Sequence, residues 1–338
     1  MGFYDFEGQV TAKTFTAHPK TDFKTGEMAA YSMEASGLGY VVFVMTSHEM
    51  DLEHMKKEAG THFRKNAHLP NRFGVLPRRN PKPEQARWFD SLKDHYWGHV
   101  CNHFEEHGII YIDAFMHNHD SLKAFPTMHP EIDAAKADVP PIGKFVRFEI
   151  DPNSKSTELE LPTILSDIPG ELARCDDRYT GKPYNHAFGA SFGPMGFEGI
   201  THTNISTGVT KVWKAGEHTT VGEPCFVPRS ADSPEGDGYL FTCCQDQETG
   251  YGSLAILDAA DINAGPVAVI ELPFRAHDGV HGQWVDASRF DSRKPLVDYA
   301  GVTPELQEKF GTGAPKPYDD LNARPVLRTV GAKLDGTL

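Results

Sequence analysis

Three histidines in this sequence stand where they could hold a transition-metal ion. His18, His99 and His281 are each predicted to close an apolar, strand-like run, with Pro, Gly or Asn close by. Neutral imidazole is a common ligand of iron, zinc and copper, and side chains from strand ends can converge at the centre of a barrel or propeller. We therefore predict a metal site built from these three histidines, although they lie far apart in the chain.

Two glutamates are candidates for orienting those imidazoles. Glu171 in "PGELARC" and Glu223 in "VGEPCFVP" precede apolar or proline-containing runs and do not belong to a charged face. A ligand histidine usually donates its second ring N–H to a carboxylate, which fixes the ring and increases its basicity. The alternative left open by the sequence is that both glutamates are exposed loop acids.

Most other histidines give a weaker signal, because their surroundings are typical of solvated side chains. They lie in a predicted polar helix and its exit loop (His48, His54, His62, His68), in a turn-like segment (His117, His119) and in a hairpin (His202). We predict no metal role for this group.

The elements that must position the candidate residues are mainly strands. Runs of β-branched and aromatic residues alternate with turn signals, a pattern that predicts about sixteen strands in meandering antiparallel sheets. Examples are the runs at 10–18, 40–46, 108–115, 144–150, 157–164, 209–215, 239–244, 253–257 and 267–274. Helical patterns are rare: "HEMDLEHMKKEAG" (48–60) predicts one helix, and "DAADINAG" (258–265) predicts a turn or short 3₁₀ insert. The sequence therefore predicts an all-β fold with short helical inserts.

The predicted strands occupy residues 1–288 without a sharp linker, so we expect a single β domain there. From Arg289 onward the chain is rich in Pro, Gly and charged residues and has little periodicity. We predict that residues 289–338 form an irregular C-terminal tail.

Composition excludes several classes of function. The 338 residues carry a net charge of −14, which argues against a nucleic-acid partner, and no apolar run is long enough to span a bilayer. The five cysteines have no CxxC spacing, and the first residues lack the pattern of a secretory signal. These features predict a cytoplasmic protein with reduced thiols. They leave contact with a membrane surface and the oligomeric state open.

Several motifs, taken together, resemble one known family. "AHPKTDFKTGE", "HVCNHFEEHGIIYIDA", "GELARCDDRYTGKPYNHAFG" and "GVHGQWVD" occur here in the order seen in carotenoid cleavage oxygenases. Within that family the sequence is most similar to the lignostilbene- and stilbene-cleaving dioxygenases. The resemblance extends over roughly residues 9–288 and does not include the tail.

The resemblance implies a seven-bladed β-propeller with a non-haem Fe²⁺ held on its axis by four histidines. By motif, His18, His99 and His281 match three of those ligands. Glu171 matches the carboxylate that supports His99, and Glu223 matches the one that supports His281. The strand that carries the remaining ligand, and the family's N-terminal part, have no counterpart in this sequence, so we expect an incomplete propeller.

The function implied by the resemblance is oxidative cleavage. An iron(II) dioxygenase of this family uses O₂ to cleave a conjugated C=C bond in an apolar small molecule, here an apocarotenoid or a hydroxystilbene, into two carbonyl products. Two other classes stay open. One is a catalytically inactive propeller homologue that acts as a binding or scaffold protein. The other is a three-histidine metal hydrolase, which is disfavoured because no acidic base adjoins the ligands.

Overall fold

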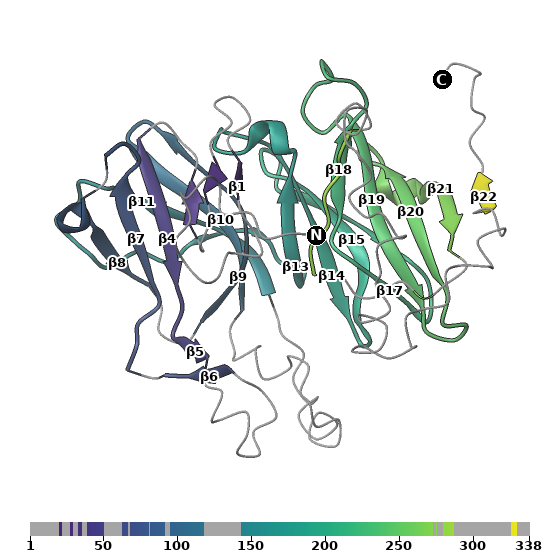
Figure 1. Ribbon diagram of the computed structural model, residues 1–338, viewed down its shortest axis with the longest axis horizontal. Coiled ribbons are helices and arrows are strands. Elements are labelled where there is room, and N and C mark those ends of the chain that lie inside the picture. Colours follow the sequence, from purple (N-terminus) through teal and green to yellow (C-terminus); the bar gives the residue numbers. More distant parts are fainter. Residues whose placement is uncertain are drawn as a thin grey trace, which may run out of the picture.

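The protein is all-β, as predicted, and its main sheets follow one another in chain order from left to right in Figure 1. The computed structural model describes residues 20–21, 28–29, 33–35, 39–50, 63–66, 68–80, 82–91, 95–117, 143–272, 275, 280–286 and 326–329. The sheets are antiparallel meanders, which is the arrangement of propeller blades.

The first two large sheets each contain four strands. The first sheet has the order β3–β4–β7–β8, with strands β3 (Met33–Ala35), β4 (Tyr40–Met45), β7 (Arg72–Pro77) and β8 (Arg87–Asp90). The second sheet has the order β12–β11–β10–β9, with strands β9 (Tyr96–Glu106), β10 (Ile109–His117), β11 (Gly143–Ile150) and β12 (Thr163–Ser166).

The third and fourth sheets complete the series. The third sheet has the order β13–β14–β15–β16, with strands β13 (Gly170–Cys175), β14 (His186–Gly193), β15 (Gly196–Asn204) and β16 (Val209–Lys214). In the fourth sheet the order is β17–β19–β20–β21–β22, and β18 also pairs with β19. Its strands are β17 (Thr219–Val221), β18 (Cys225–Pro228), β19 (Gly238–Asp246), β20 (Gly252–Asp258), β21 (Pro266–Glu271) and β22 (Val326–Thr329).

Small elements lie outside these sheets. Two two-stranded pairs are formed by β1 (Lys20–Thr21) with β2 (Met28–Ala29) and by β5 (His48–Met50) with β6 (Phe63–Lys65). Short 3₁₀ helices are η2 (Pro83–Gln85), η4 (Asp177–Tyr179) and η5 (Ile262–Ala264). The last of these confirms the insert predicted at 258–265.

The structure departs from three sequence-based predictions. The helix predicted from residue 48 is wrong at its start, because His48–Met50 form β5 and pair with β6, while residues 51–62 lie outside the described part. The strand predicted at 157–164 is displaced toward the C-terminus, because β12 begins only at Thr163. Within the predicted tail the structure describes β22 alone, which pairs with β21. The boundary at 288 stays a prediction.

The hydrophobic core lies between successive sheets. One cluster joins the first and second sheets through side chains such as Phe73, Trp97 and Phe148. Another cluster lies between the second and third sheets, and one more lies between the third and fourth sheets. The second and third sheets are therefore buried on both faces. Their strands carry apolar residues on both sides, whereas a sheet with one solvent-exposed face would alternate apolar and polar residues.

Strand β10 illustrates how the two faces are divided. Ile110, Ile112 and Ala114 pack against the first sheet, whereas Phe115, on the opposite face, packs toward the third. His117 follows Phe115 by two residues and so shares its face, because side chains alternate along a strand. This periodicity directs His117 toward β13.

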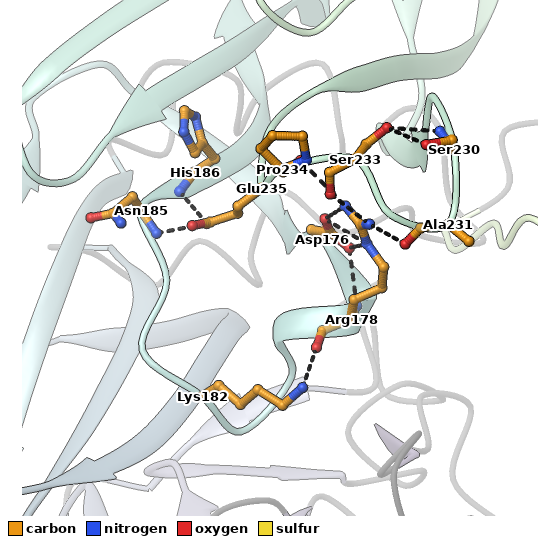
Figure 2. A network of polar contacts seen from close by, with 10 residues as sticks. All are labelled: Asp176, Arg178, Lys182, Asn185, His186, Ser230, Ala231, Ser233, Pro234 and Glu235. Carbon is orange, nitrogen blue, oxygen red and sulfur yellow. Dashed lines mark hydrogen bonds and ion pairs between the residues drawn. The ribbon is translucent and has the colours of Figure 1, made fainter.

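Polar contacts also tie the third sheet to the fourth (Figure 2). Arg178 of η4 binds the buried carboxylate of Asp176 and donates to the carbonyl oxygens of Ala231 and Ser233, at 3.0 and 2.9 Å, in the β18–β19 connection. From the same connection, Glu235 accepts hydrogen bonds from the backbone N–H groups at the start of β14. Charge-assisted hydrogen bonds thus hold the two sheets together in addition to the hydrophobic core.

The stability of this region is expected to fall as the pH is lowered. Burial first, and then electrostatic repulsion from His186 and Lys211, lower the pKa of His202 from 6.5 to about 4. In the unfolded chain this imidazole takes up a proton at higher pH than in the folded protein, so the free energy of unfolding decreases between about pH 6.5 and pH 4, by about 3 kcal/mol in full.

Urea unfolding at a series of pH values from about 7 to 4.5 tests this, since carboxylates with ordinary pKa values titrate mainly below that range. A His202→Phe variant is expected to show a flatter profile than the wild type. Parallel profiles for the two proteins would contradict the prediction.

Candidate metal centre

Two of the three predicted ligands lie together in the structure. His99 belongs to β9, and His281 lies in the described segment 280–286, yet their ring centroids are 4.8 Å apart with the ring planes at 81°. Two imidazoles bound to one ion through metal–nitrogen bonds of about 2.1 Å place their centroids about 4.5 to 5.2 Å apart. The observed separation fits a shared metal ion. His18 lies outside the described residues.

Glu171 holds the His99 side of this arrangement. Its Oε2 accepts a hydrogen bond from Nδ1 of His99 at 2.7 Å, and its Oε1 accepts one from the His99 backbone N–H at 3.0 Å. Glu171 is only 8% exposed, so the interpretation as an exposed loop acid is wrong for this residue. With Nδ1 as the donor, the ring presents Nε2 as its metal-binding nitrogen.

Glu223 plays the same part for His281. Its Oε1 accepts from Nδ1 of His281 at 3.1 Å, and its Oε2 accepts from the backbone N–H of Gly282 at 2.9 Å. Glu223 is also buried. Arg174 completes this cluster by donating from Nη1 to Glu223 Oε2 at 3.0 Å and to the Gly282 carbonyl oxygen at 2.9 Å.

Both glutamates are held in the ionised form. Burial alone would raise the pKa of Glu171, but hydrogen bonds from His117 and His99 outweigh it and hold that pKa well below its usual range. For Glu223, burial is likewise outweighed by the His281 hydrogen bond and the Arg174 charge, so its pKa is lowered. Two carboxylates that stay ionised in a buried site favour binding of a cation by the attached imidazoles.

Irregular pairing shapes the two strands that carry this cluster. Between Val100 and Trp97, β9 has one residue more than β10 opposite it, and between Glu171 and Arg174, β13 has one residue more than β14. Leu172, inside the second irregularity, has a positive φ of 56°. Bulges re-aim side chains and are frequent beside active sites. Here they direct His99 and Glu171 toward each other.

The local argument used to select His99 is corrected by the structure. His99 does not close a strand, because it lies near the start of β9, which continues to Glu106. His99 nevertheless lies at the end of the sheet where β10 finishes, because an antiparallel strand begins where its neighbour ends.

Sequence reasoning missed His117, Gly98 and Arg174. His117 was assigned to a turn, but it ends β10, and its Nε2 donates to Glu171 Oε1 at 3.0 Å. A histidine that closes an apolar run was the criterion applied to the predicted ligands, and the same criterion selects His117. Gly98 and Arg174 act through contacts across 73 and 49 residues, respectively, which no local pattern reveals.

Within the described part of the chain, no group of three or more His, Cys, Asp or Glu side chains could hold a metal ion. The described residues thus contribute two imidazoles and their carboxylates to the predicted site. None of the five cysteines, all of which the structure describes, forms a disulfide. No described helix is both long and apolar enough to cross a membrane.

Successive antiparallel sheets packed on one another are the arrangement of a propeller-type protein. The family model described as RPE65, retinal pigment epithelial membrane protein, matches residues 38–286. The chain is 31% identical to lignostilbene-alpha,beta-dioxygenase isozyme III of Sphingomonas paucimobilis, over 85% of this chain and 68% of that protein. This chain therefore belongs to the RPE65/carotenoid oxygenase family.

Two further similarities agree with this assignment. The chain is 29% identical to resveratrol cleavage oxygenase 1 of Aspergillus fumigatus, over 86% of this chain and 68% of that protein. The crystal structure of Pseudomonas brassicacearum lignostilbene dioxygenase matches with a TM-score of 0.72 at 31% identity, over 84% of this chain and 68% of that one. These relatives are oxygenases that cleave their substrates.

Proposed function

We propose that the protein is an iron(II)-dependent oxygenase that uses O₂ to cleave a conjugated C=C bond of a hydroxystilbene or an apocarotenoid into two carbonyl products. The observation that carries the proposal is the convergence of His99 and His281, each with its Nδ1 on a buried carboxylate. Membership of a family whose relatives act on lignostilbene and resveratrol supports the reaction class.

In this proposal His99, His281 and His18 hold Fe²⁺, and Glu171 and Glu223 fix the first two rings. Carboxylate partners keep Nδ1 protonated in both rings, so that the neutral imidazoles present Nε2 to the ion. Bound iron(II) supplies the redox chemistry that allows O₂ to react with an alkene. The chain's own residues orient the ligands and keep them at fixed separation.

Exposed apolar side chains that follow His281 in the chain support an apolar substrate. Trp284 and Val285, both exposed, follow His281 closely, and the Trp284 ring lies 5.3 Å from the ring of Phe241. An aromatic surface next to a metal site is suited to a planar, conjugated ligand, because such ligands gain from burial and from stacking.

The proposal is tested by loading the purified protein with Fe²⁺ without oxygen, adding resveratrol or an apocarotenal, and then admitting ¹⁸O₂. We expect two aldehyde products by mass spectrometry, with label in both for a dioxygenase. His281→Ala is expected to lose metal binding and products, and His68→Ala, at an exposed position, should behave as the wild type.

Each other outcome has a definite meaning. A protein that binds iron but cleaves neither compound would point to an inactive binding protein of the same family. A folded protein that binds no iron would contradict the metal centre itself.

A further inference from the structure

His117 occupies a position that the metal ligands alone do not explain. It is 2% exposed, and it lies at the end of β10, opposite Tyr96 of β9 on one side and Gly143 of β11 on the other. Its Nε2 is 3.0 Å from Glu171 Oε1, so the carboxylate that supports His99 is shared between two histidines. One oxygen serves each imidazole.

The carboxylate of Glu171 is fully used by this sharing. Oε2 accepts from His99 Nδ1 and from the Leu172 backbone N–H, and Oε1 accepts from the His99 backbone N–H and from His117. A carboxylate offers about four acceptor sites, so four donors saturate it. Of these donors, only His117 comes from a strand other than β9 or β13. It therefore fixes the carboxylate plane from a third direction.

The surroundings of His117 are built to admit its ring. A Cβ atom added to Gly143 would lie 2.6 Å from Cε1 of His117, and one added to Gly98 would lie 3.0 Å from its Nε2. Real Cβ atoms essentially never approach another heavy atom more closely than 3.0 Å, so only glycine fits easily at these two positions. The two glycines therefore form a cradle around the imidazole. The ring of Phe192, at 6.2 Å and nearly perpendicular, lies against it as well.

We propose that His117 is a positioning residue of the metal centre, which sets the orientation of the Glu171 carboxylate and through it the ring of His99. The inference rests on the proposed function, because it requires His99 to bind a metal ion. Without the His117 bond, Glu171 can rotate about its terminal torsion, a broad and soft one, and Oε2 then leaves the line of His99 Nδ1. His117 itself does not touch the ion.

The test titrates the metal-free protein with Co²⁺, whose visible absorption reports ligand number and geometry. Thermal unfolding of the wild type and of each variant is measured alongside. We expect His117→Phe to fill the cradle without a donor and to weaken Co²⁺ affinity by about 10- to 100-fold, with altered Co²⁺ bands. His117→Gln, which can place an amide N–H near the same point, should restore affinity to within a few fold.

The outcomes separate this inference from the proposed function. A purely structural role would lower the melting temperature of His117→Phe and leave its Co²⁺ affinity and bands unchanged, which would overturn the inference. Failure of a folded His117→Gln variant to restore binding would overturn it too, and this variant decides the matter if His117→Phe does not fold. Absence of Co²⁺ binding by the wild type would overturn the proposed function and, with it, this role.

Discussion

Replacing Gly98 with alanine is expected to weaken metal binding by at least about 100-fold and to destabilise the protein by about 3 to 5 kcal/mol. A Cβ atom at this position would lie 1.3 Å from Oε1 of Glu171 and 2.5 Å from its carboxyl carbon. The buried carboxylate is held by hydrogen bonds from His99, Leu172 and His117, so moving it out of the way costs these bonds. The clash must therefore break these hydrogen bonds and displace the His99 ring.

The prediction is checked by urea unfolding of the metal-free protein and by Co²⁺ titration. We expect Gly98→Ala to lose at least about 100-fold in affinity, beyond the loss expected for removing a single supporting contact. Gly222→Ala is the matched control, because its Cβ would meet the Cys243 carbonyl oxygen at an ordinary distance of 3.6 Å. A Gly98→Ala variant with wild-type affinity would show that the carboxylate does not orient His99.

The fold was predictable where local pattern and packing agree. The runs at 40–46, 108–115, 144–150 and 253–257 became β4, β10, β11 and β20, because β-branched and aromatic residues pack well on the pleated surface of a sheet. The prediction of a helix at 48–60 failed at its start because the charge pattern there suits a helix. His48–Met50 instead pair with β6, and local helix propensity contains no information on such a pairing with a later segment.

The candidate site was predictable in part for a different reason. The structure brings His99 and His281 together, each with one of the two glutamates, and those pairings came from the family resemblance rather than from spacing. Their role as metal ligands stays a prediction. The arrangement that holds them was not visible in the sequence. It depends on bulges and on a glycine whose missing side chain makes room for a carboxylate, and both arise only when strands far apart in the chain are packed.

Loss of the Arg174 side-chain charge is expected to have the second large effect. Arg174 is 8% exposed, and it binds both Glu223 and the carbonyl oxygen of Gly282, the residue after His281. Strand β13 therefore supports both imidazoles, through Glu171 for His99 and through Arg174 and Glu223 for His281. Replacement by methionine keeps much of the volume and leaves a buried carboxylate without its guanidinium, which costs about 3 to 5 kcal/mol.

Arg174→Met is best compared with Arg229→Met. Arg229 also pairs with two carboxylates, Asp237 and Asp258, but it does so at the surface, where such pairs contribute at most about 1 kcal/mol. Urea unfolding of both metal-free variants should thus separate them clearly, and Co²⁺ affinity should fall only for Arg174→Met. Equal losses of stability in the two variants would argue that Glu223 does not depend on the buried charge.

The difference between Arg174→Met and the wild type should also depend on pH. Because the pKa of Glu223 is held below its usual value of 4.5, its ionised form stabilises the folded protein above that pH, and this stabilisation disappears as the pH falls through the lowered pKa. The variant loses the Arg174 contribution to that shift. We therefore expect the stability gap to be full near neutral pH and to narrow below about pH 4.5, when the carboxyl group is protonated in the variant. A gap that stays constant down to acidic pH would mean that Arg174 acts by packing, through its aliphatic stem, and not by its charge.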